Sequence, residues 1–158
     1  MLREVISGGQ TGVDRAGLDA AAANGLATGG YCPKGRLAED GTIPPHYHLT
    51  EMESAAYIIR TEKNVVESDG TLILNIGDVT EGTKATHEFA LKHGRPDLIV
   101  QLDAPELITP GEVAQWIEEN EIGTLNVAGP RESKYPGGIY SAALHFLEEV
   151  FGMLRGKG

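Results

Sequence analysis

The sequence predicts an α/β fold, a Rossmann-like three-layer sandwich with a mainly parallel sheet of about five strands. Two observations predict this class. Short apolar runs such as Thr71–Ile76 lack the alternation of polar and apolar residues that marks a strand with one exposed face. Each run is separated from the next by a segment of helical pattern, and strands that alternate with helices form parallel sheets covered on both faces.

The N-terminal part holds the first strand, loop and helix. Residues 4–6 predict a short strand, and the alanine-rich segment from about residue 13 to residue 24 predicts a helix that Gly25 ends. An apolar piece at about residues 26–30 indicates a further strand. Residues 31–49 form the one long irregular segment, and its length favours a binding loop or an active-site lid over a simple connection.

The same order continues through the rest of the chain. Residues 52–68 mix Ala, Ile and Val in a pattern that predicts a helix able to break near Arg60. Thr109, Pro110 and Glu112 have the spacing of a helix cap, a first helical position and a capping box. Strands are expected at residues 71–76, 97–102 and 124–128, and helices at about residues 83–93, 109–120 and 139–154.

The composition bounds the kind of protein. The chain has 158 residues, which suits one domain over residues 1–158. No apolar run approaches the roughly 20 residues of a membrane helix, and Cys32 has no cysteine partner, so we expect a cytoplasmic protein. A formal net charge of −10 opposes binding to nucleic acid or to an anionic membrane. A small anionic ligand stays open, because backbone amides and a few local cations set the potential inside a pocket.

Three loops rich in Gly and small polar residues are expected to meet at the carboxyl edge of the sheet. They are residues 7–12, 77–83 and 129–138. Glycine lets backbone N–H groups approach an anion, and the N-terminus of a following helix adds partial positive charge. The loops therefore predict a site for the phosphate of a pterin or a nucleotide, with tight turns that bind nothing as the alternative.

The two common nucleotide motifs are absent from the first loop. Val13 follows Gly12, where a P-loop requires Lys. Ser7 stands where the first Gly of a dinucleotide fingerprint belongs. The five histidines and Cys32 show no metal-ligand spacing, so we expect no structural metal.

Several side chains are candidates for the chemistry of this edge. Asp14 lies in the first turn of a helix, where the helix dipole already favours a carboxylate, and it is the candidate catalytic acid or base. Arg131 carries a planar guanidinium group whose paired N–H donors suit a phosphate. Lys34 and Arg36 lie in the long segment, where they are expected to close over an anion. The full set of candidate binding residues is Ser7, Gly8, Gly9, Gln10, Thr11, Gly12, Asp14, Lys34, Arg36, Gly82, Thr83, Gly129, Arg131, Glu132 and Ser133.

Six segments in a fixed order carry a family resemblance: ISGGQTGVDRAGLDAA, GGYCPKGRLAEDGTIP, RTEKNVVESDGTLIL, EGTKAT, NVAGPRES and PGGIY. Together they resemble the molybdenum-cofactor carrier family, in the Rossmann-like superfamily of the lysine-decarboxylase-like phosphoribohydrolases and the DNA-processing protein DprA. The resemblance implies a cytosolic homo-oligomer, dimer or tetramer, that binds molybdenum cofactor (molybdopterin) or a nucleotide and has molybdoenzymes among its partners. Carried over by motif, the binding positions are Gly8, Gly9, Thr11, Gly12, Asp14, Gly82, Thr83, Arg131, Glu132 and Ser133.

One position departs from the phosphoribohydrolases. Their PGGxGTxxE motif carries a Glu that assists cleavage of the N-glycosidic bond, and Thr86 stands at that place here. A hydroxyl cannot replace a carboxylate as general acid or base. The departure favours a binding protein, while a nucleotide-processing enzyme that uses Asp14 and a nucleotide sensor remain as alternatives.

Overall fold

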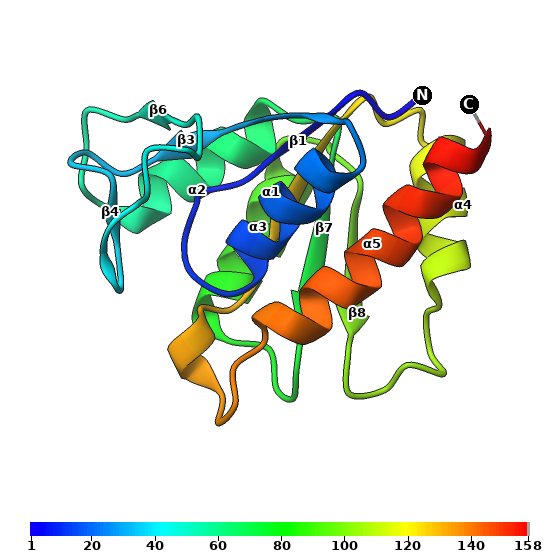
Figure 1. The fold of residues 1–158 in the computed structure, drawn as a ribbon. Coiled ribbons are helices and arrows are strands. Elements are labelled where there is room, and N and C mark those ends of the chain that lie inside the picture. The colour runs from blue at the N-terminus through cyan, green and yellow to red at the C-terminus, as the bar shows by residue number, and fades with distance from the viewer. Residues whose placement is uncertain (158) are drawn as a thin grey trace.

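Five parallel strands form the central sheet of the computed structural model, which describes residues 1–157. Their order across the sheet is β2–β1–β9–β7–β8 (Figure 1). Their bounds are Glu4–Ile6 for β1, Ala27–Gly29 for β2, Gly70–Asn75 for β7, Asp97–Gln101 for β8 and Thr124–Ala128 for β9. Every neighbouring pair is parallel, so the predicted fold class is confirmed.

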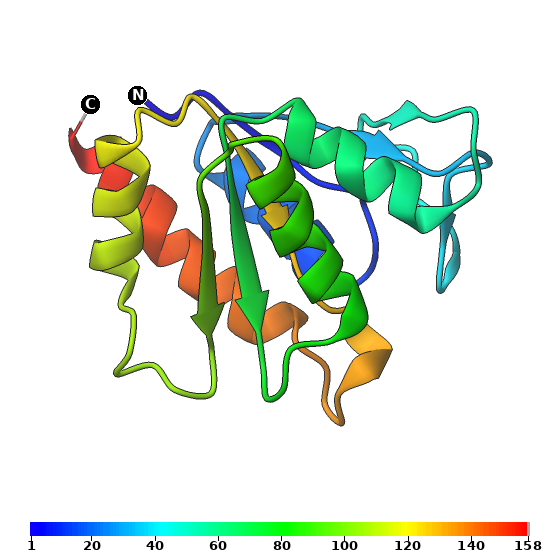
Figure 2. The ribbon, with the colours of Figure 1, turned by 180° about the vertical axis from the view of Figure 1, so that it is seen from behind.

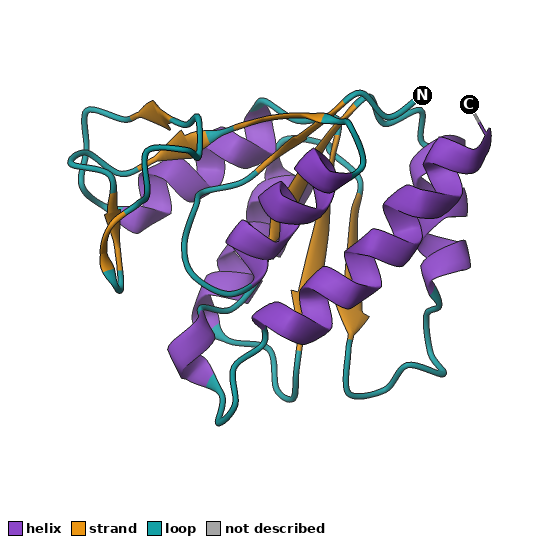
Figure 3. Cartoon of the chain, viewed as in Figure 1, coloured by secondary structure: helices purple, strands orange, loops and turns teal. Residues whose placement is uncertain are grey.

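Helices cover both faces of this sheet (Figures 2 and 3). On one face lie α1 (Val13–Ala23), α4 (Pro110–Glu119) and α5 (Tyr140–Lys157), and on the other lie α2 (Tyr57–Val66) and α3 (Glu81–Lys92). All six residues of β7 are buried, which explains its continuous apolar pattern. In the sheet, β9 lies between β1 and β7, while β2 and β8 are the outer strands. The loops that follow β1, β9 and β7 therefore lie close together at the carboxyl ends of these strands.

The predicted capping box of α4 is present. The Thr109 hydroxyl accepts a hydrogen bond from the Glu112 amide at 3.2 Å, and the Glu112 carboxylate accepts one from the Thr109 amide at 3.1 Å. Such reciprocal bonds satisfy two amides that have no partner inside the helix. The start of α4 is therefore fixed by local sequence alone.

The helix predicted over residues 52–68 is shorter than expected and has no break near Arg60. It spans Tyr57–Val66 as α2, with Arg60 in its continuous part. Its start is delayed because the preceding chain pairs with another strand. Thr50 donates its amide to the Gly30 carbonyl and Met52 donates to the Cys32 carbonyl, both at 2.8 Å, so residues 50–52 stay extended.

The segment over residues 31–51 has more order than its sequence predicts. Tyr31–Cys32 (β3) pairs with Thr50–Glu51 (β6), and Leu37–Ala38 (β4) forms a small hairpin with Gly41–Thr42 (β5). We call residues 37–42 the hairpin. Beneath it a small apolar cluster, separate from the main core, consists of Cys32, Ala38 and Ile43, with Tyr47 and Leu49 packed against it. Cys32 is thus a buried packing residue.

Arg36 holds this segment together. Its guanidinium donates hydrogen bonds to the carbonyls of Ile43 at 3.2 Å and of Pro44 and Tyr47 at 2.9 Å. Farther on, the Tyr47 hydroxyl donates to Asp19 on α1 at 3.1 Å, which ties the segment to the main layer. Three carbonyl acceptors already engage the Arg36 fork, so its observed role is structural.

Among residues 1–157, no helix combines the length and the apolar character that crossing a membrane requires. The assignment of one domain to residues 1–158 stays a prediction, and residue 158 lies outside the described part of the chain.

Candidate functional site

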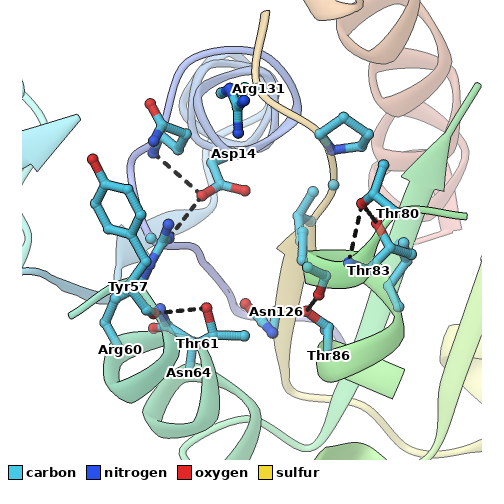
Figure 4. Close-up of a pocket in the computed structure, with 18 of the residues that line it drawn as sticks. Asp14, Tyr57, Arg60, Thr61, Asn64, Thr80, Thr83, Thr86, Asn126 and Arg131 are labelled. Atoms are coloured by element: carbon cyan, nitrogen blue, oxygen red, sulfur yellow. Dashed lines mark hydrogen bonds and ion pairs between the residues drawn. The ribbon is translucent and has the colours of Figure 1, made fainter. Parts of the chain in front are cut away.

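A pocket of about 390 Å³ lies at the carboxyl ends of β1, β9 and β7 (Figure 4). This volume falls in the range of small-molecule sites. Three walls form it: the first turns of α2, the N-terminus of α3, and the loops that follow β1 and β9. The lining residues are Gly8, Gln10, Asp14, Tyr57, Arg60, Thr61, Asn64, Ile73, Thr80, Glu81, Gly82, Thr83, Thr86, Asn126, Val127, Ala128, Gly129, Pro130, Arg131 and Lys134.

A buried ion pair joins α1 to the α2 wall. Arg60 Nη1 lies 3.1 Å from Asp14 Oδ2, and the two side chains are only 11% and 6% exposed. The same oxygen accepts the Gln10 amide at 3.2 Å. Desolvation raises the pKa of Asp14 above its usual value, against the opposing effects of the Arg60 charge and these hydrogen bonds. The Arg60 Nε atom is buried and has no hydrogen-bond partner within the described chain.

The opposite wall is the N-terminus of α3. Thr80 caps this helix, and its hydroxyl accepts the Thr83 amide at 3.3 Å. The first-turn amides of Glu81 and Gly82 have no acceptor inside the helix, and the helix dipole places partial positive charge there. Thr86, at the position where the sequence resemblance predicts the Glu of the phosphoribohydrolases, donates its hydroxyl to the Gly82 carbonyl at 3.0 Å. This wall thus offers donors suited to an anion, with Thr86 engaged within the helix.

Two cations close the third side. Arg131 and Lys134 come from the loop between β9 and α5, and both line the pocket. With Arg60 they place three positive side chains around a small volume, against the two carboxylates of Asp14 and Glu81, in a protein whose net charge is −10. The local charge therefore favours an anionic ligand even though the whole surface does not.

The glycines of the first loop make room for protein atoms. A Cβ on Gly8 would lie 1.4 Å from Arg60 Nη1, and one on Gly12 would lie 2.5 Å from the Pro130 carbonyl oxygen. Gly9 and Gly129 are similarly crowded, by the Leu49 side chain and the Leu74 carbonyl. Gly82 differs, because a Cβ there would meet no atom within 4 Å. Gly82 is thus the glycine with open space on a wall of the pocket.

The amides of the first loop are also used internally. Gly9 donates to Ser7 Oγ at 3.3 Å, and Thr11 donates to Gln10 Oε1 at 3.0 Å. The Val13 amide donates to the Pro130 carbonyl at 3.3 Å. The first loop therefore positions Asp14 and Arg60, while the second and third loops supply the N-terminus of α3 and the two cations.

Glu39 attaches the hairpin to the first and third loops by hydrogen bonds. Its carboxylate accepts hydrogen bonds from the hydroxyls of Thr11 and Ser133 and, at 3.2 Å, from the Ser133 amide. Arg131 Nε lies 3.5 Å from the same carboxylate. Desolvation alone would raise the pKa of Glu39, but these hydrogen bonds and the Arg131 charge hold it below its usual value. The neighbouring Asp40 pairs with both terminal nitrogens of Arg15, at 2.7 and 2.9 Å.

The structure divides the candidate binding residues into three groups. Those that line the pocket are Gly8, Gln10, Asp14, Gly82, Thr83, Gly129 and Arg131. Those that hold the loops beside it are Ser7, Gly9, Thr11, Gly12, Glu132 and Ser133. Lys34 and Arg36 lie in the segment over residues 31–51 and are not among the pocket-lining residues.

Several lining residues had no place in the sequence-based set. They are Tyr57, Arg60, Thr61 and Asn64 on α2, together with Asn126 at β9. The hydropathy pattern predicted a helix within residues 52–68. It did not show which face of that helix lies against the loops that follow β1 and β9. Among residues 1–157, no group of three or more His, Cys, Asp or Glu side chains is arranged to hold a metal ion.

Comparison with known proteins finds relatives of this chain. The circularly permutated YpsA SLOG family matches residues 5–151. The crystal structure of a protein from Syntrophus aciditrophicus SB, named "putative molybdenum carrier protein", superposes with a TM-score of 0.85. The two chains are 45% identical, over 95% of this chain and 94% of that one. No match was found among curated proteins.

Substituting two pocket glycines separates their roles. We expect Gly8→Ala to lower stability by about 1–3 kcal/mol, because the new methyl displaces the Arg60 guanidinium. Gly82→Ala is the matched control and should leave stability unchanged or slightly higher, since its methyl enters open space at a helical position. Urea unfolding of both variants measures this, and equal losses would contradict the assignment.

Removing the charge of Glu39 tests its role in attaching the hairpin to the two loops. We expect Glu39→Gln to destabilise the protein at pH 7 by about 1 kcal/mol, because solvent at a partly exposed site reduces the contribution of hydrogen bonds to a charged group. Because the folded-state pKa is lowered, the carboxylate stabilises above its ordinary pKa and this stabilisation is lost as pH falls through the folded value. The difference between wild type and variant should therefore shrink by pH about 3.

Urea unfolding at both pH values makes this comparison. Glu53→Gln, an exposed acidic residue outside the hairpin, is the matched control and should show no such difference. A loss of unfolding free energy in Glu39→Gln that is the same at both pH values would argue against this role of the Glu39 charge.

Proposed function

Because the chain belongs to the circularly permutated YpsA SLOG family, we propose that it is a binding protein for molybdenum cofactor or a related phosphate-bearing pterin or nucleotide. The observation that carries the proposal is the set of donors on two walls of the pocket. The open N-terminus of α3, with Gly82, faces the same 390 Å³ volume as Arg131 and Lys134. A helix N-terminus with nearby cations is the usual arrangement for a phosphate.

The relative from Syntrophus aciditrophicus supports the choice of ligand. That protein is named a putative molybdenum carrier and shares 45% of its residues with this chain. The pocket fits the organic part of such a cofactor better than its metal, since the described residues hold no cluster of metal-ligating side chains. In this proposal the protein binds the phosphate and the ring, and molybdenum arrives as part of the cargo.

Thr86 supports binding over hydrolysis. The hydrolases of the superfamily need a carboxylate at this place, and the Thr86 hydroxyl is already hydrogen-bonded within α3. We propose that the protein carries its ligand without converting it. The cytoplasmic location, the dimer or tetramer and the molybdoenzyme partners remain predictions from the family resemblance.

Asp14 favours one second function. It is a carboxyl group on the pocket wall whose pKa is raised by desolvation, which is the usual condition of a general acid or base. A nucleotide-processing enzyme that uses Asp14 is therefore the alternative to a carrier.

Charge removal at the phosphate wall tests the leading proposal. We expect the double variant Arg131→Ala, Lys134→Ala to weaken binding of anaerobically released molybdenum cofactor by at least about tenfold, since two charge-assisted contacts are lost. Binding is measured by quenching of protein fluorescence, with guanosine 5′-monophosphate as a second ligand. Lys92→Ala, an exposed cation at the far end of α3, is the control and should bind like wild type. Failure of the wild-type protein to bind either ligand would overturn the proposal.

A turnover panel distinguishes the two functions. The carrier predicts no release of base or phosphate from the nucleoside 5′-monophosphates of adenine, guanine, cytosine and uracil, measured by liquid chromatography. Turnover that disappears in Asp14→Asn, while the variant keeps the thermal stability of wild type, would establish the enzyme instead.

A further inference from the structure

The α2 wall of the pocket has a different chemistry from the two walls assigned to phosphate. It presents an aromatic ring, Tyr57, which is 45% exposed, beside the Asp14–Arg60 pair (Figure 4). The Arg60 guanidinium carbon lies 5.5 Å from the centroid of the Tyr57 ring. A phosphate gains nothing from an aromatic surface or from a carboxylate. This wall is therefore suited to another part of the ligand.

Asp14 and Arg60 each keep one polar atom available. Both hydrogen bonds to the Asp14 carboxylate end on Oδ2, from the Gln10 amide and from Arg60 Nη1, so Oδ1 has no donor within the described chain. Arg60 Nη2 likewise has no hydrogen bond or ion pair among residues 1–157. Asp14 thus offers an acceptor and Arg60 offers a donor at the same ion pair.

The other polar groups on this wall are already engaged. The Asn64 amide group bonds both the N–H and the carbonyl of Tyr31 at 2.9 Å, which fixes β3. The Thr61 hydroxyl donates to the Tyr57 carbonyl at 2.9 Å. Asp14 and Arg60 are therefore the groups on the α2 side that remain able to form hydrogen bonds with the polar edge of a ligand.

A carboxylate beside a guanidinium matches an edge that carries N–H next to C=O. The carboxylate accepts from the N–H groups and the guanidinium donates to the carbonyl, each in a charge-assisted hydrogen bond. The lactam edge of guanine, hypoxanthine and the pterins has this pattern. Such rings are also planar and stack favourably on aromatic side chains.

We propose that the α2 wall binds a lactam-bearing planar heterocycle, stacked on Tyr57 and paired through its N–H and C=O edge with Asp14 and Arg60. This inference rests on the proposed function, because the phosphate of the same ligand lies across the pocket at the N-terminus of α3. It assigns the two ends of the ligand to two walls and selects guanine-like and pterin rings over adenine.

Titration calorimetry with matched probes tests the assignment. Guanosine and inosine 5′-monophosphates carry the lactam edge, adenosine 5′-monophosphate lacks it, ribose 5-phosphate has no ring system, and neopterin carries the edge without a phosphate. We expect the two lactam nucleotides to bind at least about tenfold more tightly than the other two phosphates, and neopterin to bind measurably. We expect Tyr57→Leu to cost the lactam nucleotides about tenfold and to leave ribose 5-phosphate unchanged.

Two control variants and the remaining outcomes complete the test. Tyr57→Phe keeps the aromatic ring and should retain the preference for the lactam nucleotides over ribose 5-phosphate, whereas Ile58→Ala, at an exposed neighbour outside the pocket lining, should bind like wild type. Equal binding of all four phosphates, or tighter binding of the adenine nucleotide, would overturn the inference and leave phosphate binding standing. A Tyr57→Leu variant that weakens ribose 5-phosphate as much as guanosine 5′-monophosphate would also overturn it. If no probe binds, the proposed function and this inference fall together.

Discussion

The contact on which the site depends is the buried ion pair between Asp14 and Arg60. It joins the first helix to α2 across the carboxyl edge of the sheet, at an N–O separation of 3.1 Å. Removing one partner of a buried pair leaves an uncompensated charge, which makes such pairs strong constraints on local geometry. Gly8 makes the pair possible, because any side chain there would occupy the position of the guanidinium. The conformation of the glycine-rich first loop therefore depends on an arginine from a distant part of the sequence.

The rest of the pocket is built around this pair by two further connections. Glu39 brings the hairpin onto the first and third loops, and Arg36 gives the surrounding segment its internal order through three carbonyl contacts. On the far side, the N-terminus of α3 stays open and keeps its amides for a ligand. The site thus has one wall with the buried Asp14–Arg60 pair, and an opposite side with the helix amides of α3 and the cations Arg131 and Lys134. A ligand with a planar ring at one end and a phosphate at the other matches this division.

The sequence predicted the fold well and the site only in part, for physical reasons that differ. Strands such as β9 and the capping box of α4 follow from local pattern and local hydrogen bonding, so their predicted positions were close to those in the structure. The long segment before α2 was predicted as irregular, because strands of two residues leave no periodic signal. Arg60 and Tyr57 were missed because the helical pattern alone does not show which face of α2 lies against the neighbouring loops. The first loop was interpreted as an anion-binding loop, which stays a prediction; in the structure the amides of Gly9 and Thr11 and the Cβ positions of its glycines are used by the protein itself.

The central claim is that this pocket holds a phosphate-bearing heterocycle that the protein carries. Native mass spectrometry of the gently purified protein, followed by denaturation and identification of any released small molecule, tests it most directly. The account predicts a bound pterin phosphate, with or without molybdenum, or a guanine-type nucleotide, in a one-to-one complex with the chain. Release of a ligand that has no phosphate, or of one that has no heterocyclic ring, would contradict it.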